Sequence, residues 1–176
     1  TRMGETRLAR WDHFAGDYWF IPAENAKNRQ EHRLPMTPTA KKLITHYAQW
    51  QYTHVGKRAF LFPGEVGPVS IRTAQYWSET IRFKAFTSHA LRKLCRTIIA
   101  DMGVDTMVGE RILNHTLPLL LRTYVNSTLD KGMLMALDAY HAHLITLGFD
   151  DVAPEIMRQS TTEPSEPDEP MLVGWL

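Results

Sequence analysis

The sequence predicts a mainly helical fold with a small antiparallel β-sheet near its N-terminus. Two β-prone runs, YWFIP at residues 18–22 and HRLPM at residues 32–36, flank a polar stretch. After them, apolar residues recur at the spacing of amphipathic helices for most of the chain. With 176 residues, 44% of them apolar and 22% charged, the chain has the size and composition of one ordinary soluble domain.

We expect the two β-prone runs to pair as a hairpin with a long, mobile and partly basic turn. A short strand near Trp11 could precede the hairpin. Thr37 is followed by Pro38, which is the pattern of an N-cap with proline at the first helical position. This pattern predicts a helix that ends at about Tyr52.

Three further helices are predicted in the middle of the chain. Ser70 begins the pattern SIRTAQYWSETIRF, and Ser88 stands as the N-cap of SHALRKLCRTIIADMG, which Gly103 should stop. The helix of DTMVGERILN ends at Asn114.

Cys95 lies in a helical pattern and is predicted to be a core residue. Because it is the only cysteine, it excludes an internal disulfide and fits a reducing compartment such as the cytoplasm.

The last predicted helix begins at Asp130 and ends at Gly148. Its apolar residues recur at spacings of three and four, so they should form the face that packs on the core. The residues expected on this face are Leu134, Leu137, Tyr140 and Leu144. The MLM stretch at residues 133–135 is likewise expected to pack in the core.

Residues 1–150 and 151–176 differ in charge and in pattern. The first part carries 19 Lys/Arg and 13 Asp/Glu, a net charge of +6, whereas the second carries 1 and 6, a net charge of −5. The basic part suits a partner with a phosphate backbone. The stretch RQSTTEPSEPDEP predicts disorder, and the final MLVGWL could be a loose end or a docking peptide. We therefore expect a folded domain over 1–150 and a flexible tail over 151–176.

The first residues show neither a membrane segment nor a signal peptide. No run of 18 apolar residues occurs anywhere in the chain, so no bilayer span is predicted. The opening TRMGETRLARW lacks the apolar stretch of a signal peptide and begins without methionine. We expect further residues to precede Thr1 in the natural chain.

Four residues of the second half stand at characteristic spacings. TSHALR places His89 three residues before Arg92, and LNHTLPLLLRTY places His115 nine residues before Tyr124. Arg92 and His115 are 23 residues apart. Alone, each histidine would more often be a capping or core residue, and a tyrosine in a leucine-rich segment more often a core or boundary residue. Their joint spacing changes this interpretation and resembles the tyrosine recombinase, or phage integrase, family.

The resemblance covers residues 1 to about 147 and includes three further matches. TRMGE places Arg2 just before the acidic Glu5, and the predicted hairpin turn holds Lys27. ERILNH resembles the family's helix that leads to the sequence L-G-H. Asn114 stands where the family commonly has glycine, and asparagine is the non-glycine residue that best tolerates a positive φ. The fold implied is that of the integrase catalytic domain.

The resemblance implies a reaction that breaks and rejoins DNA strands without a cofactor. Arg2 and Arg92 would clamp the two nonbridging oxygens of the scissile phosphate, as planar bidentate donors. Tyr124 would attack phosphorus and form a 3′-phosphotyrosine, which retains the energy of the broken bond, so that no ATP is required.

The family's remaining roles fall on four other residues. By resemblance, His89 is the general base for the tyrosine, and His115 donates a hydrogen bond to the phosphate. Lys27 is the candidate general acid that protonates the departing 5′ oxygen. Glu5 would orient Arg2 rather than react.

The resemblance also implies partners and a setting. The expected substrate is duplex DNA with an inverted-repeat core site, bound by a tetramer of full-length protomers whose N-terminal core-binding domain would precede Thr1. The helix of residues 130–148 could dock on a neighbouring protomer, and excision or DNA-bending proteins could assist. The segment after Tyr124 is similar to integrases of temperate phages and genomic islands, so integration or excision of such an element in a bacterial cytoplasm, near the nucleoid, is expected.

Three alternatives remain open at the level of sequence. A type IB topoisomerase uses a similar residue set for DNA relaxation, although its usual lysine and tyrosine surroundings match less well. A DNA-binding regulator with the same fold could have lost cleavage, although all expected positions are filled. The third is a zinc site built from histidines, against which stands the absence of an HExxH pattern. Its candidate ligands would be His89, His115, His141 and His143.

Overall fold

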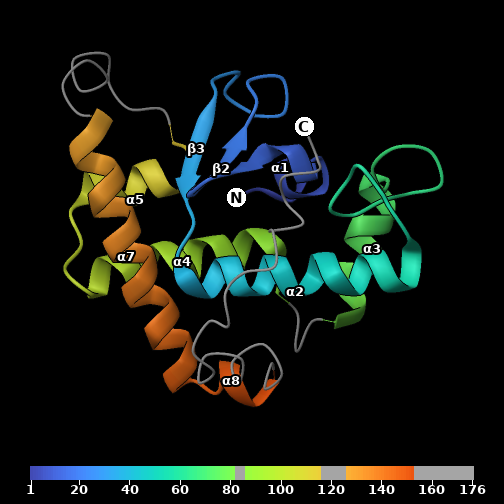
Figure 1. The fold of residues 1–176 in the computed structure, drawn as a ribbon. Helices are drawn as coiled ribbons and strands as arrows, with labels where there is room; N and C mark the ends of the chain where they lie inside the picture. The colour runs from blue at the N-terminus through green and yellow to red at the C-terminus, as the bar shows by residue number, and fades with distance from the viewer. Residues whose placement is uncertain (82–85, 116–125, 153–176) are drawn as a thin grey trace, which may run out of the picture.

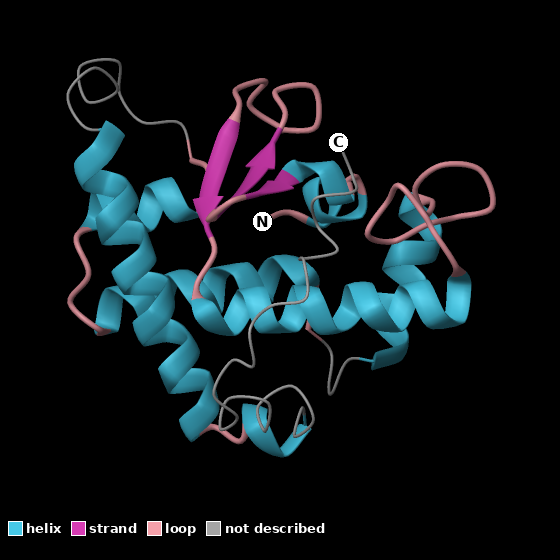
Figure 2. Cartoon of the chain, in the orientation of Figure 1, coloured by secondary structure: helices cyan, strands magenta, loops and turns pink. Residues whose placement is uncertain are grey.

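A computed structural model of the chain describes residues 1–81, 86–115 and 126–152, and the side chains of residues 126–128 are not included in that description. Helices dominate these residues, and one small three-stranded antiparallel sheet lies among them (Figures 1 and 2). The prediction of a mainly helical fold with a small antiparallel sheet is therefore confirmed. The predicted tail from residue 153 onward, with its MLVGWL end, lies outside the described residues.

The sheet has the order β1-β2-β3, with β1 at Phe14–Ala15, β2 at Tyr18–Ile21 and β3 at His32–Pro35. The predicted hairpin is confirmed, because β2 and β3 pair in antiparallel fashion. The strand expected near Trp11 lies slightly later, as β1, because Trp11–His13 form a short 3-10 helix.

The turn between β2 and β3 makes backbone hydrogen bonds of its own. The backbone amides of Asn25 and Ala26 donate to the carbonyl of Pro22 at 3.0 and 3.1 Å. The amide of Arg29 donates to the carbonyl of Ala26 at 3.0 Å, and Ala26 itself is buried. These bonds satisfy part of the backbone of the turn. The expected mobility of the turn stays a prediction.

Helix α2 spans Pro38–Val55, and helix α3 spans Ile71–Ile81. Thr37 is the N-cap of α2, as predicted, and its Oγ1 accepts a hydrogen bond from the Ala40 amide at 3.1 Å. The helix continues past the predicted end at Tyr52 to Val55. Ser70 precedes α3 as expected, and its Oγ accepts from the Thr73 amide at 3.0 Å.

Helix α4 spans Ser88–Asp101, and its N-cap is Thr87 rather than the predicted Ser88. Thr87 has the extended backbone of a cap, and its Oγ1 accepts from the Ala90 amide at 3.2 Å. Both residues have a hydroxyl that could cap a helix, and the backbone conformation decides between them. Gly103, at φ 75°, ends the helix as predicted.

Helix α5 spans Thr106–Ile112, with Asp105 as its N-cap. The chain leaves this helix through Asn114, which has φ 52° in the left-handed region. The helix ends two residues before the predicted end at Asn114. The expected positive φ at Asn114 is confirmed, and asparagine accepts this conformation more readily than other non-glycine residues.

Helix α7 spans Asn126–Thr146 and is followed by the short α8, Phe149–Val152. It begins before the predicted start at Asp130. Its most buried residues are Leu129, Met133 and Ala136, so the predicted core face is wrong at Leu134, which is 39% exposed. Met135, also expected in the core, is 64% exposed. Leu137 and Tyr140 do pack against the core, as predicted.

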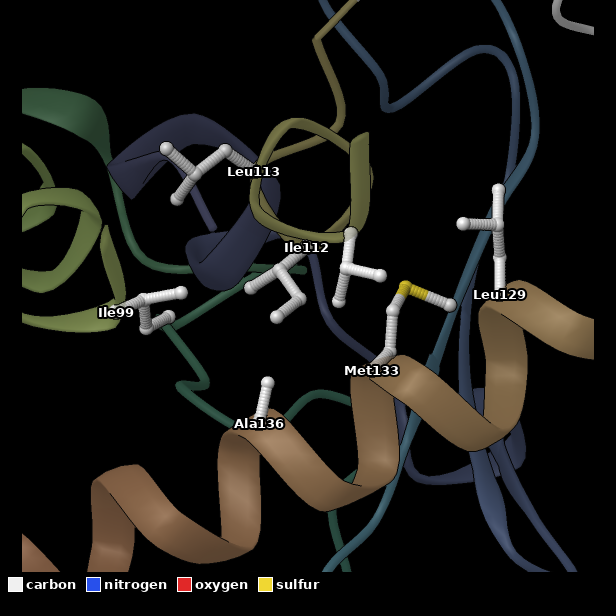
Figure 3. Packing of buried hydrophobic residues seen from close by; sticks show 7 residues of the cluster. Ile99, Ile112, Leu113, Leu129, Met133 and Ala136 are labelled. Carbon is white, nitrogen blue, oxygen red and sulfur yellow. The ribbon is translucent and has the colours of Figure 1, made fainter. Parts of the chain in front are cut away.

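The position of Gly132 in α7 explains which side of this helix packs on the core. A Cβ at Gly132 would lie 3.0 Å from Cγ2 of Val108 in α5, so the two helices approach closely at this point. Small residues on one side of α7 permit this approach, and Met133 is buried between α7 and the rest of the core (Figure 3). The spacing of apolar residues does not distinguish the buried side of α7 from the adjacent exposed side, because leucines occur on both sides.

The main core joins α4, α5 and α7, with Cys95 packed against it as predicted for a core residue. Its buried members are Ile99, Val108, Ile112, Leu113, Leu129, Met133 and Ala136. Helix α7 also contacts β3 and α2. No helix within the described ranges combines the length and apolar character needed to cross a bilayer.

Candidate active site

Arg2 and Glu5 form a tight pair at the start of the short helix α1, Met3–Arg7. One oxygen of Glu5 accepts from the Arg2 backbone amide at 2.7 Å, and the other accepts from Nη1 of Arg2 at 3.0 Å. Glu5 is only 3% exposed. Burial alone raises the pKa of its carboxyl, but the two hydrogen bonds and the charge of Arg2 outweigh burial and hold the pKa below its usual value. Glu5 therefore stays ionised and fixes the Arg2 guanidinium.

Arg92 is buried in α4, with 8% of its surface exposed. Its Nη2 donates to the main-chain carbonyl of Leu113, whereas Nη1 is buried without a partner in the described part of the chain. Burial, and then the nearby charge of Arg2, lower the pKa of Arg92, and the charge of Glu5 opposes them. The guanidinium remains protonated, as arginine does in proteins. Two guanidinium groups thus share one region, which favours an anion between them.

His115 is placed by the turn at Asn114 and held by Glu110 of α5. Nδ1 of His115 lies 2.5 Å from Oε2 of Glu110, and Nε of Arg96 donates to Oε1 of the same carboxylate at 2.9 Å. Burial alone raises the pKa of Glu110, but the hydrogen bonds from Arg96 and His115 lower it below the usual value. With Nδ1 engaged by Glu110, Nε2 is the ring nitrogen left to meet a ligand. To donate through Nε2 while Nδ1 donates to Glu110, the ring must carry a proton on each nitrogen.

Lys27 lies in the turn between β2 and β3, and its side chain is exposed. The residue before it, Ala26, is buried. The residue after it, Asn28, donates through Nδ2 to Oδ1 of Asn114 at 3.1 Å and to its carbonyl oxygen at 3.4 Å. The turn that bears Lys27 therefore lies against the segment that bears His115.

His89 lies in the first turn of α4, three residues before Arg92, so the two share one side of the helix. Its side chain is exposed, and within the described ranges it makes no hydrogen bond or ion pair. Tyr124, the predicted nucleophile, lies outside the described residues. The structure thus brings together Arg2, Glu5, Arg92, His115 and the turn of Lys27, and it says nothing of the tyrosine.

The zinc interpretation finds no support in the described ranges, where no cluster of three or more His, Cys, Asp or Glu side chains could hold a metal. His115 is engaged by Glu110. His141 is engaged elsewhere, because its Nδ1 lies 2.6 Å from Oγ1 of the buried Thr37.

Two of the contacts that shape the site were not predicted from the sequence. Glu110 falls within the quoted ERILNH stretch, but its pairing with His115 depends on how the chain turns after α5. The Asn28–Asn114 contact joins residues 86 positions apart, and no local pattern signals it. A carboxylate one helical turn before a candidate histidine is the one signal that the sequence did offer.

Comparison with known families identifies the family of the chain. The model of the phage integrase family matches residues 1–130, which include the described candidate residues and Tyr124. Searches of curated proteins and of solved structures found no match. Since the family model covers most of the chain, the chain belongs to the phage integrase family of tyrosine recombinases, whose general activity is DNA recombination by strand breakage and rejoining.

Proposed function

We propose that this chain is the catalytic domain of a site-specific recombinase that cleaves and rejoins DNA through a 3′-phosphotyrosine at Tyr124. The observation that carries the proposal is the arrangement around Leu113–His115. Its carbonyl at Leu113 accepts from Arg92, its Asn114 accepts from the Lys27 turn, and its His115 is a candidate ligand of phosphate. The segment of residues 113–115 therefore connects three of the six predicted catalytic positions, which are Lys27, Arg92 and His115.

The scissile phosphate would bind between Arg2 and Arg92. A phosphodiester gains negative charge in the pentacoordinate transition state, and fixed guanidinium groups stabilise that charge without reorganising. The ion pair with Glu5 restricts Arg2, and the bond to Leu113 restricts Arg92. The unpartnered Nη1 of Arg92 retains a donor for a phosphate oxygen.

Proton transfers would accompany the exchange at phosphorus. The oxygen of Tyr124 forms a bond to phosphorus while the bond to the 5′ oxygen breaks. His89 takes the phenolic proton, and Lys27 donates a proton to the departing oxygen. His115 donates a hydrogen bond to the phosphate through Nε2. In the second half of the cycle, a 5′ hydroxyl of the partner strand attacks the phosphotyrosine and regenerates Tyr124.

The natural substrate would be duplex DNA with an inverted-repeat core site, recombined by a tetramer during integration or excision of a prophage or genomic island. Residues 1–150 would supply the catalytic domain, in the bacterial cytoplasm. Helix α7 buries one stripe on its own core and exposes Leu134 and Met135 on another, so the exposed stripe is the one that could dock on a neighbouring protomer. Excision or DNA-bending proteins could act beside it.

The experiment that tests this proposal is a matched comparison of the wild type with Tyr124→Phe on a nicked duplex that traps the cleaved state. The reaction is run in EDTA with the cognate site. The wild type should form a covalent DNA adduct, and Tyr124→Phe should bind the duplex equally but form no adduct, since only the nucleophilic oxygen is lost. Adduct formation by Tyr124→Phe would reject the assigned nucleophile. Binding without any adduct by the wild type would favour the non-cleaving regulator.

A further inference from the structure

Asn28 and Asn114 form the direct side-chain connection between the Lys27 turn and the segment of His115. Nδ2 of Asn28 lies 3.1 Å from Oδ1 of Asn114 and 3.4 Å from its carbonyl oxygen. The contact spans 86 residues of sequence, so it joins two parts of the chain that are far apart in sequence. It also lies directly beside two of the proposed catalytic residues, Lys27 and His115.

The amide of Asn28 is oriented from both ends. Its Oδ1 accepts from the backbone amide of Gln30 at 3.3 Å, which is the local pattern of an asparagine turn. That bond settles which end of the amide is oxygen, so Nδ2 is the end that reaches Asn114. The donor is thus fixed by the turn that bears Lys27 and not by a freely rotating side chain.

Asn114 is restricted by burial and by its backbone conformation. It is 3% exposed and has φ 52°, which turns the chain from α5 toward His115. A glycine would adopt this φ more easily but would offer no side-chain acceptor to Asn28. Asn114 therefore has two separable properties, a backbone conformation and an amide oxygen, and substitution by glycine removes only the second.

We propose that Asn28 and Asn114 are positioning residues that set where the ammonium group of Lys27 stands relative to the phosphate. The inference rests on the proposed function, in which Lys27 protonates the 5′ oxygen. Lys27 has a long, flexible and exposed side chain, so its reach depends on where its backbone is held. The buried Ala26 holds the backbone on one side, and the bond from Asn28 holds it on the other.

The chemistry of the leaving group allows this role to be isolated. With an ordinary substrate, the P–O5′ bond breaks as a proton moves from Nζ of Lys27 to the 5′ oxygen. In a substrate whose bridging 5′ oxygen is replaced by sulfur, the same bond cleavage releases a thiolate, which is a weak base and needs no proton. A defect in the placement of Lys27 should therefore disappear with the sulfur substrate, whereas a general structural defect should persist.

The experiment measures single-turnover cleavage by the full-length protein at saturating DNA, on both substrates. Asn28→Ala and Asn114→Gly should each lose about 10- to 100-fold on the oxygen substrate, because a small misplacement of a catalytic group has effects of this size. Both should recover to within about 3-fold of the wild type on the sulfur substrate, a margin close to the ordinary scatter of such effects. The double variant should lose no more than the worse single variant, because both remove one contact. Asn25→Ala, which lies in the same turn and makes no side-chain hydrogen bond in the described ranges, should match the wild type on both.

Three outcomes distinguish the possible failures. Equal losses by Asn28→Ala on both substrates, or no loss on either, would overturn the positioning role while leaving the proposed function intact. Lys27→Ala provides the reference, since it should be slow on the oxygen substrate and rescued by sulfur. If sulfur does not rescue Lys27→Ala, then Lys27 is not the general acid, and the role inferred for Asn28 and Asn114 fails with it. Absence of any adduct from the wild type would reject the proposed function itself.

Discussion

At the scale of single residues, Arg92 joins the core to the candidate site. It is buried, it donates to the carbonyl of Leu113 through one terminal nitrogen, and its other terminal nitrogen has no partner in the described ranges. A buried donor without a partner is costly, and such a group is retained where a ligand can satisfy it. The planar guanidinium offers separate terminal nitrogens to Leu113 and to a phosphate oxygen, whereas the three N–H donors of an ammonium group all lie on one atom.

Arg92→Lys should therefore reduce the single-turnover cleavage rate by about 10²- to 10³-fold, the size seen when one donor to a developing charge is removed. The charge is preserved, so DNA binding should change little. Lys93→Ala, at the exposed neighbouring position, is the control and should cleave at the wild-type rate with saturating DNA. A near-normal rate for Arg92→Lys, with an unchanged thermal midpoint, would reject the role of the Arg92 guanidinium as a donor to the phosphate.

The residues of the site could be predicted in part. The spacing of His89, Arg92 and His115 identified the candidates, and the expected positive φ of Asn114 is present. The partner of His115, Glu110, was not predicted, because it depends on the direction in which the chain leaves α5. Pair contacts between distant segments, such as Asn28 with Asn114, leave no periodic signal in a single sequence.

At the scale of elements, capping residues determine where several helices begin. Thr37 is fully buried, and its hydroxyl both caps α2 and meets Nδ1 of His141 in α7. Ser70 plays only the first of these roles, at the exposed start of α3. Such caps could be predicted from sequence because they are local. The face that α7 buries could not, since it follows from the close approach of Gly132 to Val108.

Thr37→Val should lower the free energy of unfolding by about 2 kcal/mol, because it removes the cap and leaves the ring of His141 without its partner. Ser70→Ala should cost about 1 kcal/mol or less, since only an exposed cap is lost. Urea unfolding of the two variants beside the wild type measures the difference. Equal losses for both would show that the contact between Thr37 and His141 contributes nothing.

At the scale of the whole molecule, one buried histidine makes folding depend on pH. His32 in β3 is 1% exposed, and neither of its ring nitrogens makes a hydrogen bond within the described ranges. Burial, followed by the charge of Arg111, lowers its pKa to about 4, although the charge of Glu5 and the nearby backbone of Ile112 oppose this. The unfolded chain therefore binds a proton at His32 at a higher pH than the folded chain does, so stability falls as the pH decreases.

The contribution of neutral His32 to the free energy of unfolding should be complete above about pH 6.5 and should be lost progressively toward pH 4. At pH 5 the loss should be about 2 kcal/mol relative to pH 7, with a smaller loss in the same direction from His141, whose pKa burial also lowers. Urea unfolding at several pH values would measure it. His32→Leu should flatten the dependence, whereas His54→Gln, at an exposed position, should retain it. An unchanged slope in His32→Leu would contradict this account of the buried ring.

The role of Tyr124 as the nucleophile is tested by identifying the residue that becomes covalently joined to DNA. The full-length protein is trapped on a nicked duplex carrying its cognate site in EDTA, then digested, and the peptide that bears a nucleotide is sequenced by mass spectrometry. The nucleotide should be found as a 3′-phosphate ester on Tyr124 and on no other residue. A nucleotide attached to another side chain, or bound duplex without any covalent attachment, would contradict this role.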